Sequence, residues 1–374
     1  MGALRRIPLV LGLVLAATIA VRAQAAEPDP ERLVFVTGAE SARIVAIDGD
    51  TDAIVRTYEV PGVPRRSLIA RAARIVVTVT AEHPGQIHFL DITSGRLVRS
   101  LDLGFDVTAL QLAEDGETIA AAGPGRIAVI DAGTGAVEWA RPVPLTPSAI
   151  LFDKKGGYLL AGDAERARVH RIALHGEAGA GVVDLPSAGA GGVVHIARTP
   201  GGGTGMAVDG RGAVTMIDLK SWRVAATLSL PGRQARIFPT VNSQYFLLPN
   251  LGTRTLSIVS TWTRKESERL TLGGDVVTLN TLLADTVLFA FDPRTAAATV
   301  FDLDRRQRLA DIALPGKPGA TVTGPGGLKV YVALSDRDAV AVIDVRSLKV
   351  SKTVEKIGFV PAGILTGGGL SFCH

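Results

Sequence analysis

The chain has 374 residues, of which 47% are hydrophobic, 20% charged and only 5% aromatic. Its 42 glycines and 20 prolines are typical of short strands joined by turns, and this composition excludes a coiled coil and a disulfide-rich miniprotein. The formal charge is +4, but Arg5, Arg6 and Arg22 lie in a segment that we expect to be cleaved. The remaining 37 basic and 36 acidic residues nearly balance, which gives no basis for nucleic-acid binding.

Residues 1–25 have the features of a secretory signal peptide. Two arginines precede an apolar run over residues 7–21, and Ala23-Gln24-Ala25 offers the small residues that signal peptidase accepts. The run is shorter than the roughly 20 residues that span a bilayer. We therefore expect cleavage, a mature chain beginning near Ala26 without a membrane span, and a periplasmic or secreted location. An uncleaved N-terminal anchor is the alternative.

One pattern recurs through the rest of the chain: an alternating apolar run that ends in Asp and is followed by a turn. The marker positions are 40 to 45 residues apart, and Asp is replaced in two of the eight units: Asp48, Asp91, Asp131, Ala173, Asp218, Ser260, Asp302 and Asp344. Asp in a turn accepts hydrogen bonds from the backbone N–H groups that follow it. We therefore expect these residues to cap hairpins rather than to form one catalytic or metal site.

Each unit contains four short alternating runs. In the third unit they are Thr108–Leu112, Thr118–Ala122, Ile127–Ile130 and Ala136–Ala140. Period-2 alternation between Gly, Pro and Asp turns predicts antiparallel strands, and four strands every 40 to 45 residues predict a propeller blade. The fold class is therefore an all-β propeller with eight four-stranded blades, forming a single domain over residues 26–374. Seven blades are the alternative if the unit at residues 157–202 is irregular.

The two ends of the repeat complement each other. The first unit begins at residues 32–36 without a preceding inner strand, whereas Pro361–Thr366 is an inner strand without a blade of its own. We expect Pro361–Thr366 to join the first unit, because this pairing closes the ring and leaves no open sheet edge.

Three segments of the last unit carry a family resemblance: Tyr-Val-Ala-Leu-Ser at 331–335, Ala-Val-Ala-Val-Ile-Asp at 339–344 and Lys-Val-Ser-Lys-Thr-Val at 349–354. They resemble the YVTN-repeat family of WD40-like β-propellers. The layout is also similar to the eight-bladed haem-binding propeller of periplasmic cytochrome-type nitrite reductases and their cofactor-maturation relatives. This resemblance implies a redox-accessory or maturation protein that binds a haem-type cofactor.

A second resemblance concerns a quinone cofactor. The run from Asp131 through Thr134 and Gly135 to Trp139 is similar to the docking motif of pyrroloquinoline-quinone enzymes. Those enzymes repeat the Trp in most blades, whereas the equivalent residues here are Arg99 in the second unit and Ala226 in the fifth. We therefore interpret Trp139 as a core residue.

The strongest site prediction comes from aligning the eight inner strands. Their third positions are Arg66, Ala109, Ala149, His195, Arg236, Thr278, Ala320 and Gly363. We expect this position to lie at the mouth of the central channel, where Arg66, His195 and Arg236 would bind a carboxylate or phosphate. The loop residues Arg65, Arg233 and Lys317 add positive charge. An unperturbed imidazole would make binding pH-dependent near neutrality. In the alternative, each Arg pairs with an Asp of the next blade and seals the ring.

No catalytic signature accompanies this charge: the sequence has no Gly-x-Ser-x-Gly elbow, phosphate-binding loop or Cys-x-x-Cys-His haem attachment. Cys373 and His374 are the only candidates for a metal site. We therefore expect a monomeric, non-enzymatic binding or scaffold protein for a periplasmic protein partner or a small anionic ligand. A redox-accessory protein with a haem-type or quinone cofactor is one alternative, and a hydrolase or lactonase is the other.

Overall fold

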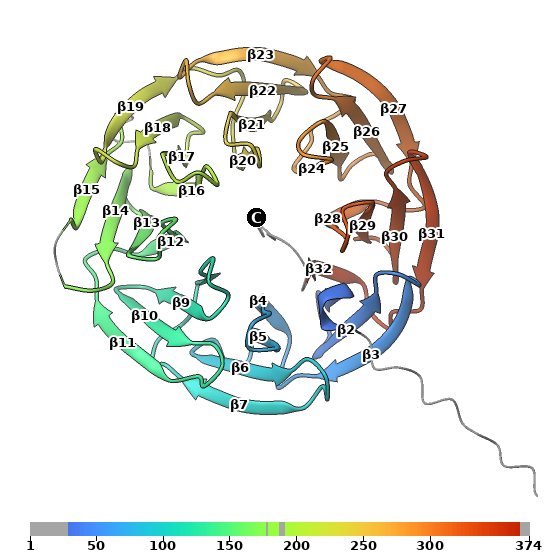
Figure 1. The fold of residues 1–374 in the computed structure, drawn as a ribbon, viewed down its shortest axis with the longest axis horizontal. Helices are drawn as coiled ribbons and strands as arrows, with labels where there is room; N and C mark the ends of the chain where they lie inside the picture. The colour runs from blue at the N-terminus through green and yellow to red at the C-terminus, as the bar shows by residue number, and fades with distance from the viewer. Residues whose placement is uncertain (1–28, 177–178, 187–190, 367–374) are drawn as a thin grey trace, which may run out of the picture.

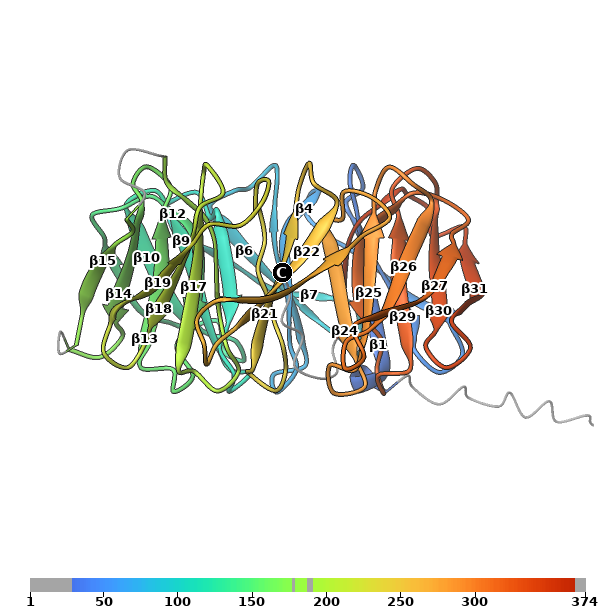
Figure 2. The same cartoon turned by 90° about the horizontal axis from the view of Figure 1, so that it is seen from above.

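The computed structural model describes residues 29–176, 179–186 and 191–366. The predicted signal peptide and the candidate metal ligands Cys373 and His374 lie outside these residues. Eight four-stranded antiparallel sheets stand around a central axis (Figure 1) and form a short cylinder when seen from the side (Figure 2). The structure therefore confirms an all-β eight-bladed propeller and excludes the seven-bladed alternative. Among the described residues, no helix is both long enough and apolar enough to cross a membrane.

The blades are numbered in chain order, and their strands are given from the channel outward. Blade 1 contains β32 (Pro361–Thr366), β1 (Leu33–Gly38), β2 (Arg43–Asp48) and β3 (Ala53–Glu59), and blade 2 contains β4 (Pro64–Ala70), β5 (Ile75–Thr80), β6 (Gln86–Asp91) and β7 (Leu97–Asp102). Blade 3 contains β8 (Ala109–Leu112), β9 (Thr118–Gly123), β10 (Arg126–Asp131) and β11 (Val137–Pro142). Blade 4 contains β12 (Pro147–Phe152), β13 (Tyr158–Asp163), β14 (Arg168–Ala173) and β15 (Gly181–Asp184).

Blade 5 contains β16 (Val193–Arg198), β17 (Thr204–Asp209), β18 (Val214–Asp218) and β19 (Arg223–Leu228), and blade 6 contains β20 (Phe238–Pro239), β21 (Tyr245–Asn250), β22 (Thr255–Ser260) and β23 (Glu266–Thr271). Blade 7 contains β24 (Thr278–Leu282), β25 (Val287–Asp292), β26 (Ala297–Asp302) and β27 (Gln307–Ala313). Blade 8 contains β28 (Pro318–Thr323), β29 (Lys329–Leu334), β30 (Ala339–Asp344) and β31 (Lys349–Glu355). A short 3₁₀ helix, η1 (Pro30–Arg32), precedes β1 and was not predicted.

The core lies between neighbouring blades rather than in one central layer. The second and third strands of most blades are buried on both faces, as in β5, whereas the outermost strand β7 is exposed along almost its whole length. One interblade cluster joins Ile127 and Val129 of blade 3 to Leu159 and Ala161 of blade 4. Burial on two faces explains why the alternating pattern weakens into continuous apolar runs in these middle strands.

The ring closes as predicted, through β32. This strand pairs antiparallel with β1, so that Ile364 lies opposite Val36 and Thr366 opposite Val34. Blade 8 also contacts blade 1: Lys329 Nζ donates to Asp52 Oδ1 at 2.8 Å, and the Tyr331 hydroxyl donates to the same carboxylate. The first blade is therefore built from both ends of the described chain.

The six marker aspartates cap hairpin turns. Asp131 Oδ1 accepts hydrogen bonds from the backbone N and the hydroxyl of Thr134, both at 2.6 Å, and these bonds lower the pKa of the Asp131 carboxyl. Asp344 makes the equivalent pair of bonds with Ser347 at 2.7 Å. The capping role predicted from the repeat is confirmed at all six positions: Asp48, Asp91, Asp131, Asp218, Asp302 and Asp344.

The irregular blade is not where the sequence suggested. Blade 4 contains four paired strands, although its outer strand β15 has only four residues. The shortest inner strand is instead β20 in blade 6, which has two residues. Pro239 ends β20, and a proline has no backbone N–H with which to extend a sheet. Trp139 lies opposite Val129 and packs on the core shared by blades 3 and 4, as expected.

Candidate functional site

The eight inner strands enclose a central channel. Two overlapping cavities occupy it, with volumes of about 1250 Å³ and about 800 Å³, and both are lined by Arg66, Ala149 and His195. All eight third positions of the inner strands line these cavities, as the alignment predicted. In several blades a register shift immediately precedes this position, for example between Pro64 and Arg66 and between Val193 and His195. The inner strands therefore present their third residues to one shared space.

Arg66 lies on β4 with an exposed side chain. Its Nε donates to the backbone oxygen of Thr108 in blade 3 at 3.1 Å, and its Nη1 donates to the oxygen of Arg65 at 3.2 Å. No carboxylate of the described residues forms an ion pair with Arg66. The guanidinium is thus held by backbone carbonyl groups, and no carboxylate of the described chain compensates its positive charge at the channel. Arg66 therefore does not follow the alternative in which each Arg pairs with an Asp of the next blade.

His195 on β16 is the neighbour of Arg236, which precedes β20 in the next blade. The His195 side chain is half-buried, and within the described chain its Nδ1 is buried without a hydrogen-bond partner. Burial, together with the smaller effect of the positive charge of Arg236, lowers the pKa of His195 to about 4. The imidazole is therefore neutral at pH 7. This corrects the expectation that His195 would titrate near neutrality.

Arg236 faces the same channel. Its side chain reaches solvent, but the surrounding walls desolvate it and lower the pKa of its guanidinium. An arginine remains protonated at physiological pH despite such a shift. Because blades 2 and 6 are four blades apart in a ring of eight, Arg66 and Arg236 occupy opposite walls of the channel.

The three other predicted cations are placed differently. Arg65 lines the larger cavity beside Arg66. Arg233 and Lys317 are exposed and are not among the residues that line either cavity. The backbone of Arg233 pairs with Leu251, and the backbone N of Lys317 donates to Asp336 at 3.0 Å. The structure thus brings Arg65, Arg66, His195 and Arg236 to one space and leaves Arg233 and Lys317 outside it.

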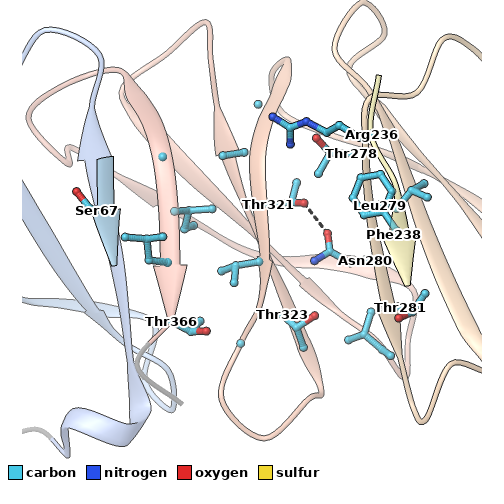
Figure 3. Close-up of a pocket in the computed structure, with 18 of the residues that line it drawn as sticks. Ser67, Arg236, Phe238, Thr278, Leu279, Asn280, Thr281, Thr321, Thr323 and Thr366 are labelled. Carbon is cyan, nitrogen blue, oxygen red and sulfur yellow. Dashed lines mark hydrogen bonds between the residues drawn. The ribbon is translucent and has the colours of Figure 1, made fainter. Parts of the chain in front are cut away.

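The channel wall formed by blades 7 and 8 carries uncharged polar side chains, of which only Thr278 was predicted to face the channel. Thr278, Asn280 and Thr281 come from β24, whereas Thr321 and Thr323 come from β28 (Figure 3). We call these five residues the amide–hydroxyl wall. The signal in the sequence is the concentration of Thr and Asn in two consecutive inner strands, β24 and β28. The facing strands β8 and β12 contribute apolar residues such as Leu110, Leu112 and Leu151.

The end of the channel nearest η1 has mixed charge. Glu31 of η1 pairs with Arg71, which follows β4, at 3.0 Å, and both residues line the two cavities. Asp285, after β24, also lines the larger cavity and accepts a hydrogen bond from the backbone N of Asn242. Within the described ranges, no group of three or more His, Cys, Asp or Glu residues is arranged to hold a metal ion.

The fold and channel define an eight-bladed β-propeller with a polar, cation-bearing central cavity. No family model matches this sequence, and no curated protein matches it, so the YVTN resemblance stands on the quoted segments alone. Among solved structures, the chain is similar to the dihydro-heme d1 dehydrogenase NirN in complex with DHE. That similarity has a TM-score of 0.78 at 15% identity and covers 91% of this chain and 76% of NirN.

Two further structures have the same general fold. A functionally unknown protein from Desulfotomaculum acetoxidans matches with a TM-score of 0.59 at 12% identity, over 89% of this chain and 98% of that one. The hydrazine synthase of Kuenenia stuttgartiensis matches with a TM-score of 0.56 at 14% identity, over 75% of this chain and 95% of that one. At these identities the comparisons establish a shared propeller architecture.

Proposed function

We propose that this chain is a non-enzymatic binding propeller that holds a carboxylate-bearing small molecule in its central channel. The observation that carries the proposal is the placement of Arg66 and Arg236 on opposite walls of one cavity of about 1250 Å³. A guanidinium binds a carboxylate through two parallel hydrogen bonds, and such charge-assisted bonds are the strongest that a side chain offers. Two opposed guanidiniums favour a ligand with two separated anionic groups.

The size of the cavity favours a large ligand. Typical small-molecule sites measure about 300 to 1000 Å³, so this channel accommodates a macrocycle as well as a simple anion. A tetrapyrrole with two propionates combines this size with two separated carboxylates. The likeness to NirN, which was solved in complex with DHE, supports a haem-type tetrapyrrole as the ligand class.

The residues of the channel fit such a group. Haem iron accepts a neutral imidazole as an axial ligand. His195 is neutral at pH 7 and lines the channel. Arg66 and Arg236 would bind the carboxylates, and His195 would ligate the iron. The bound group would supply redox chemistry, while the protein would hold it and restrict its contact with water.

The cellular setting of this function comes from the sequence. We propose a periplasmic or secreted protein, because residues 1–25 have the pattern of a cleaved signal peptide. A ligand carrier in the periplasm would exchange its ligand with a protein partner, in agreement with the accessory role that the haem-propeller resemblance implies.

The test is a titration of the protein beginning at Ala26 with iron protoporphyrin IX and with dihydro-heme d1, followed by visible absorption. We expect saturable binding of at least one tetrapyrrole and a spectral shift that His195→Ala abolishes. Arg66→Ala and Arg236→Ala should each weaken binding about tenfold or more, since a charge-assisted bond contributes about 1.5–3 kcal/mol.

Arg233→Ala is the matched control, because Arg233 is an exposed arginine of the same loop as Arg236 but lies outside the channel lining. Its affinity should equal that of the wild type. Failure of both tetrapyrroles to bind, or an equal loss in Arg233→Ala and Arg236→Ala, would overturn the proposal.

A further inference from the structure

The amide–hydroxyl wall forms one side of the channel and differs in chemistry from the arginine positions. Its five side chains are half-buried and line the larger cavity. Apart from Asp285 at the end of the wall, no residue of β24, β28 or their adjoining turns that lines this cavity is charged. The wall therefore offers hydrogen bonds without net charge, and it suits a neutral polar group better than a second anion.

One hydrogen bond fixes the orientation of the central residue of this wall. The Thr321 hydroxyl on β28 donates to Asn280 Oδ1 on β24, across the boundary between blades 8 and 7 (Figure 3). The amide oxygen of Asn280 is thereby occupied. Asn280 Nδ2, with its two N–H donors, has no hydrogen-bond partner among the described residues, and Asn280 lines the channel cavity (Figure 3).

The free donors decide which ligand group fits. An amide N–H donates to a carbonyl oxygen, and the bond to Thr321 keeps the amide from presenting its own oxygen instead. A protein site built to donate a hydrogen bond discriminates against a ligand that lacks the acceptor, because its polar group is then left unpaired. A carboxylate finds stronger partners at Arg66 and Arg236.

We propose that Asn280 is a specificity-determining residue that recognises an uncharged carbonyl oxygen on the channel ligand, with Thr321 as its positioning residue. This inference rests on the proposed function, since it assumes that the ligand is held in the channel by its carboxylates. The ligand then carries two kinds of oxygen: anionic groups bound by the arginines and at least one ring-borne carbonyl at the wall of blades 7 and 8.

The test uses two porphyrins that share both propionates and differ in carbonyl content: deuteroporphyrin IX and its diacetyl derivative. We expect the wild type to bind the diacetyl compound about three- to tenfold more tightly, the range that one neutral hydrogen bond supplies. Asn280→Leu should remove this preference, because the variant should bind the diacetyl compound no more tightly than deuteroporphyrin IX. Asn280→Asp, which keeps the acceptor for Thr321 but loses the N–H donors, should also remove the preference.

Two further variants separate recognition from general disturbance of the channel. Thr321→Val should reduce the preference, because it releases the Asn280 amide from its fixed orientation. Thr227→Val, at an exposed threonine of the outermost strand β19 that does not line either cavity, should keep the preference at its wild-type value. Melting curves of all variants confirm that the propeller is folded.

The possible failures are distinguishable. A wild-type protein that binds neither porphyrin contradicts the proposed function and this inference with it. A wild-type protein that binds both equally, or an Asn280→Leu variant that keeps the preference, overturns the carbonyl assignment alone and leaves the arginine site in place.

Discussion

Arg198 on β16 donates a hydrogen bond to the carboxylate of Glu114, which lies in the turn after β8, so that blade 5 is joined to blade 3 across the channel-facing end of blade 4. Only 3% of the Arg198 side chain is exposed, against 34% of the Glu114 side chain. The guanidinium also donates to the backbone oxygens of Phe152 at 2.7 Å and Thr199 at 3.2 Å. This ion pair connects two blades that are not neighbours.

The first prediction concerns the ion pair between Arg198 and Glu114. Glu114→Ala leaves the buried Arg198 charge without its partner, and such a change typically costs about 3–5 kcal/mol, less here because Glu114 is partly exposed. Urea denaturation should show a clear loss of stability. The double variant Glu114→Ala with Arg198→Met should recover part of this loss, because it removes the uncompensated charge. Additive effects of the two substitutions would show that the pair is not coupled.

The second prediction concerns closure of the ring. A chain that ends at Gly358 lacks β32, which exposes the edge of β1 and removes the buried Ile364 from between blades 8 and 1. We expect a large fall in melting temperature and aggregation through the open edge. A chain that ends at Leu370 keeps β32 and should melt close to the full-length protein. Equal thermal melts for the two truncations would contradict the closing role of β32.

The third prediction concerns the contact between blades 8 and 1. The hydroxyl of the fully buried Tyr331 donates to Asp52 and lies 3.2 Å from the oxygen of Gly49, and burial together with the Asp52 charge raises the pKa of this phenol. Tyr331→Phe removes these bonds and should cost about 1–3 kcal/mol in urea denaturation.

Tyr245→Phe is the control for this substitution, because Tyr245 is half-buried and its hydroxyl forms no hydrogen bond in the described structure. It should leave the urea midpoint nearly unchanged. A Tyr331→Phe protein as stable as the Tyr245→Phe protein would assign the closure to packing alone.

The fourth prediction follows from the low pKa of His195. The unfolded chain binds a proton at His195 near pH 6.5, whereas the folded chain binds it only near pH 4. The unfolded state therefore holds more protons between these values, so the contribution of His195 is complete above pH 6.5 and is lost as the pH falls toward 4. His195→Gln should show a shallower loss of unfolding free energy over this window.

His88 and His170 also have lowered pKa values and titrate in the same direction, but they are present in both proteins and cancel in the comparison. Identical pH dependence of stability in the wild type and His195→Gln would show that His195 is not desolvated by the channel. We also expect ligand affinity to be unaffected by His195 titration between pH 6.5 and pH 8, because the imidazole is neutral throughout that range.

Much of the fold could be predicted because its signals are local. An Asp that caps the next turn acts within three residues, as Asp131 does with Thr134, and strand alternation has a period of two. Repetition of these local signals fixed the blade count, the closure by Pro361–Thr366 and the ring of inner-strand positions that faces the channel. The short inner strand of blade 6 was not predicted, although its cause is also local, since Pro239 ends β20.

Other features depend on contacts that exist only after the ring has closed. The bonds from Thr321 to Asn280, from Arg198 to Glu114 and from Tyr331 to Asp52 join residues 41, 84 and 279 positions apart. The pKa of His195 depends on burial and on a charge in the next blade, and Arg233 lies outside the channel lining although it is three residues from Arg236. The sequence by itself determined the repeated blade and its closure, because turns and alternation are local. Only the tertiary structure decided which side chains share the channel and with what charge, because those contacts form between blades.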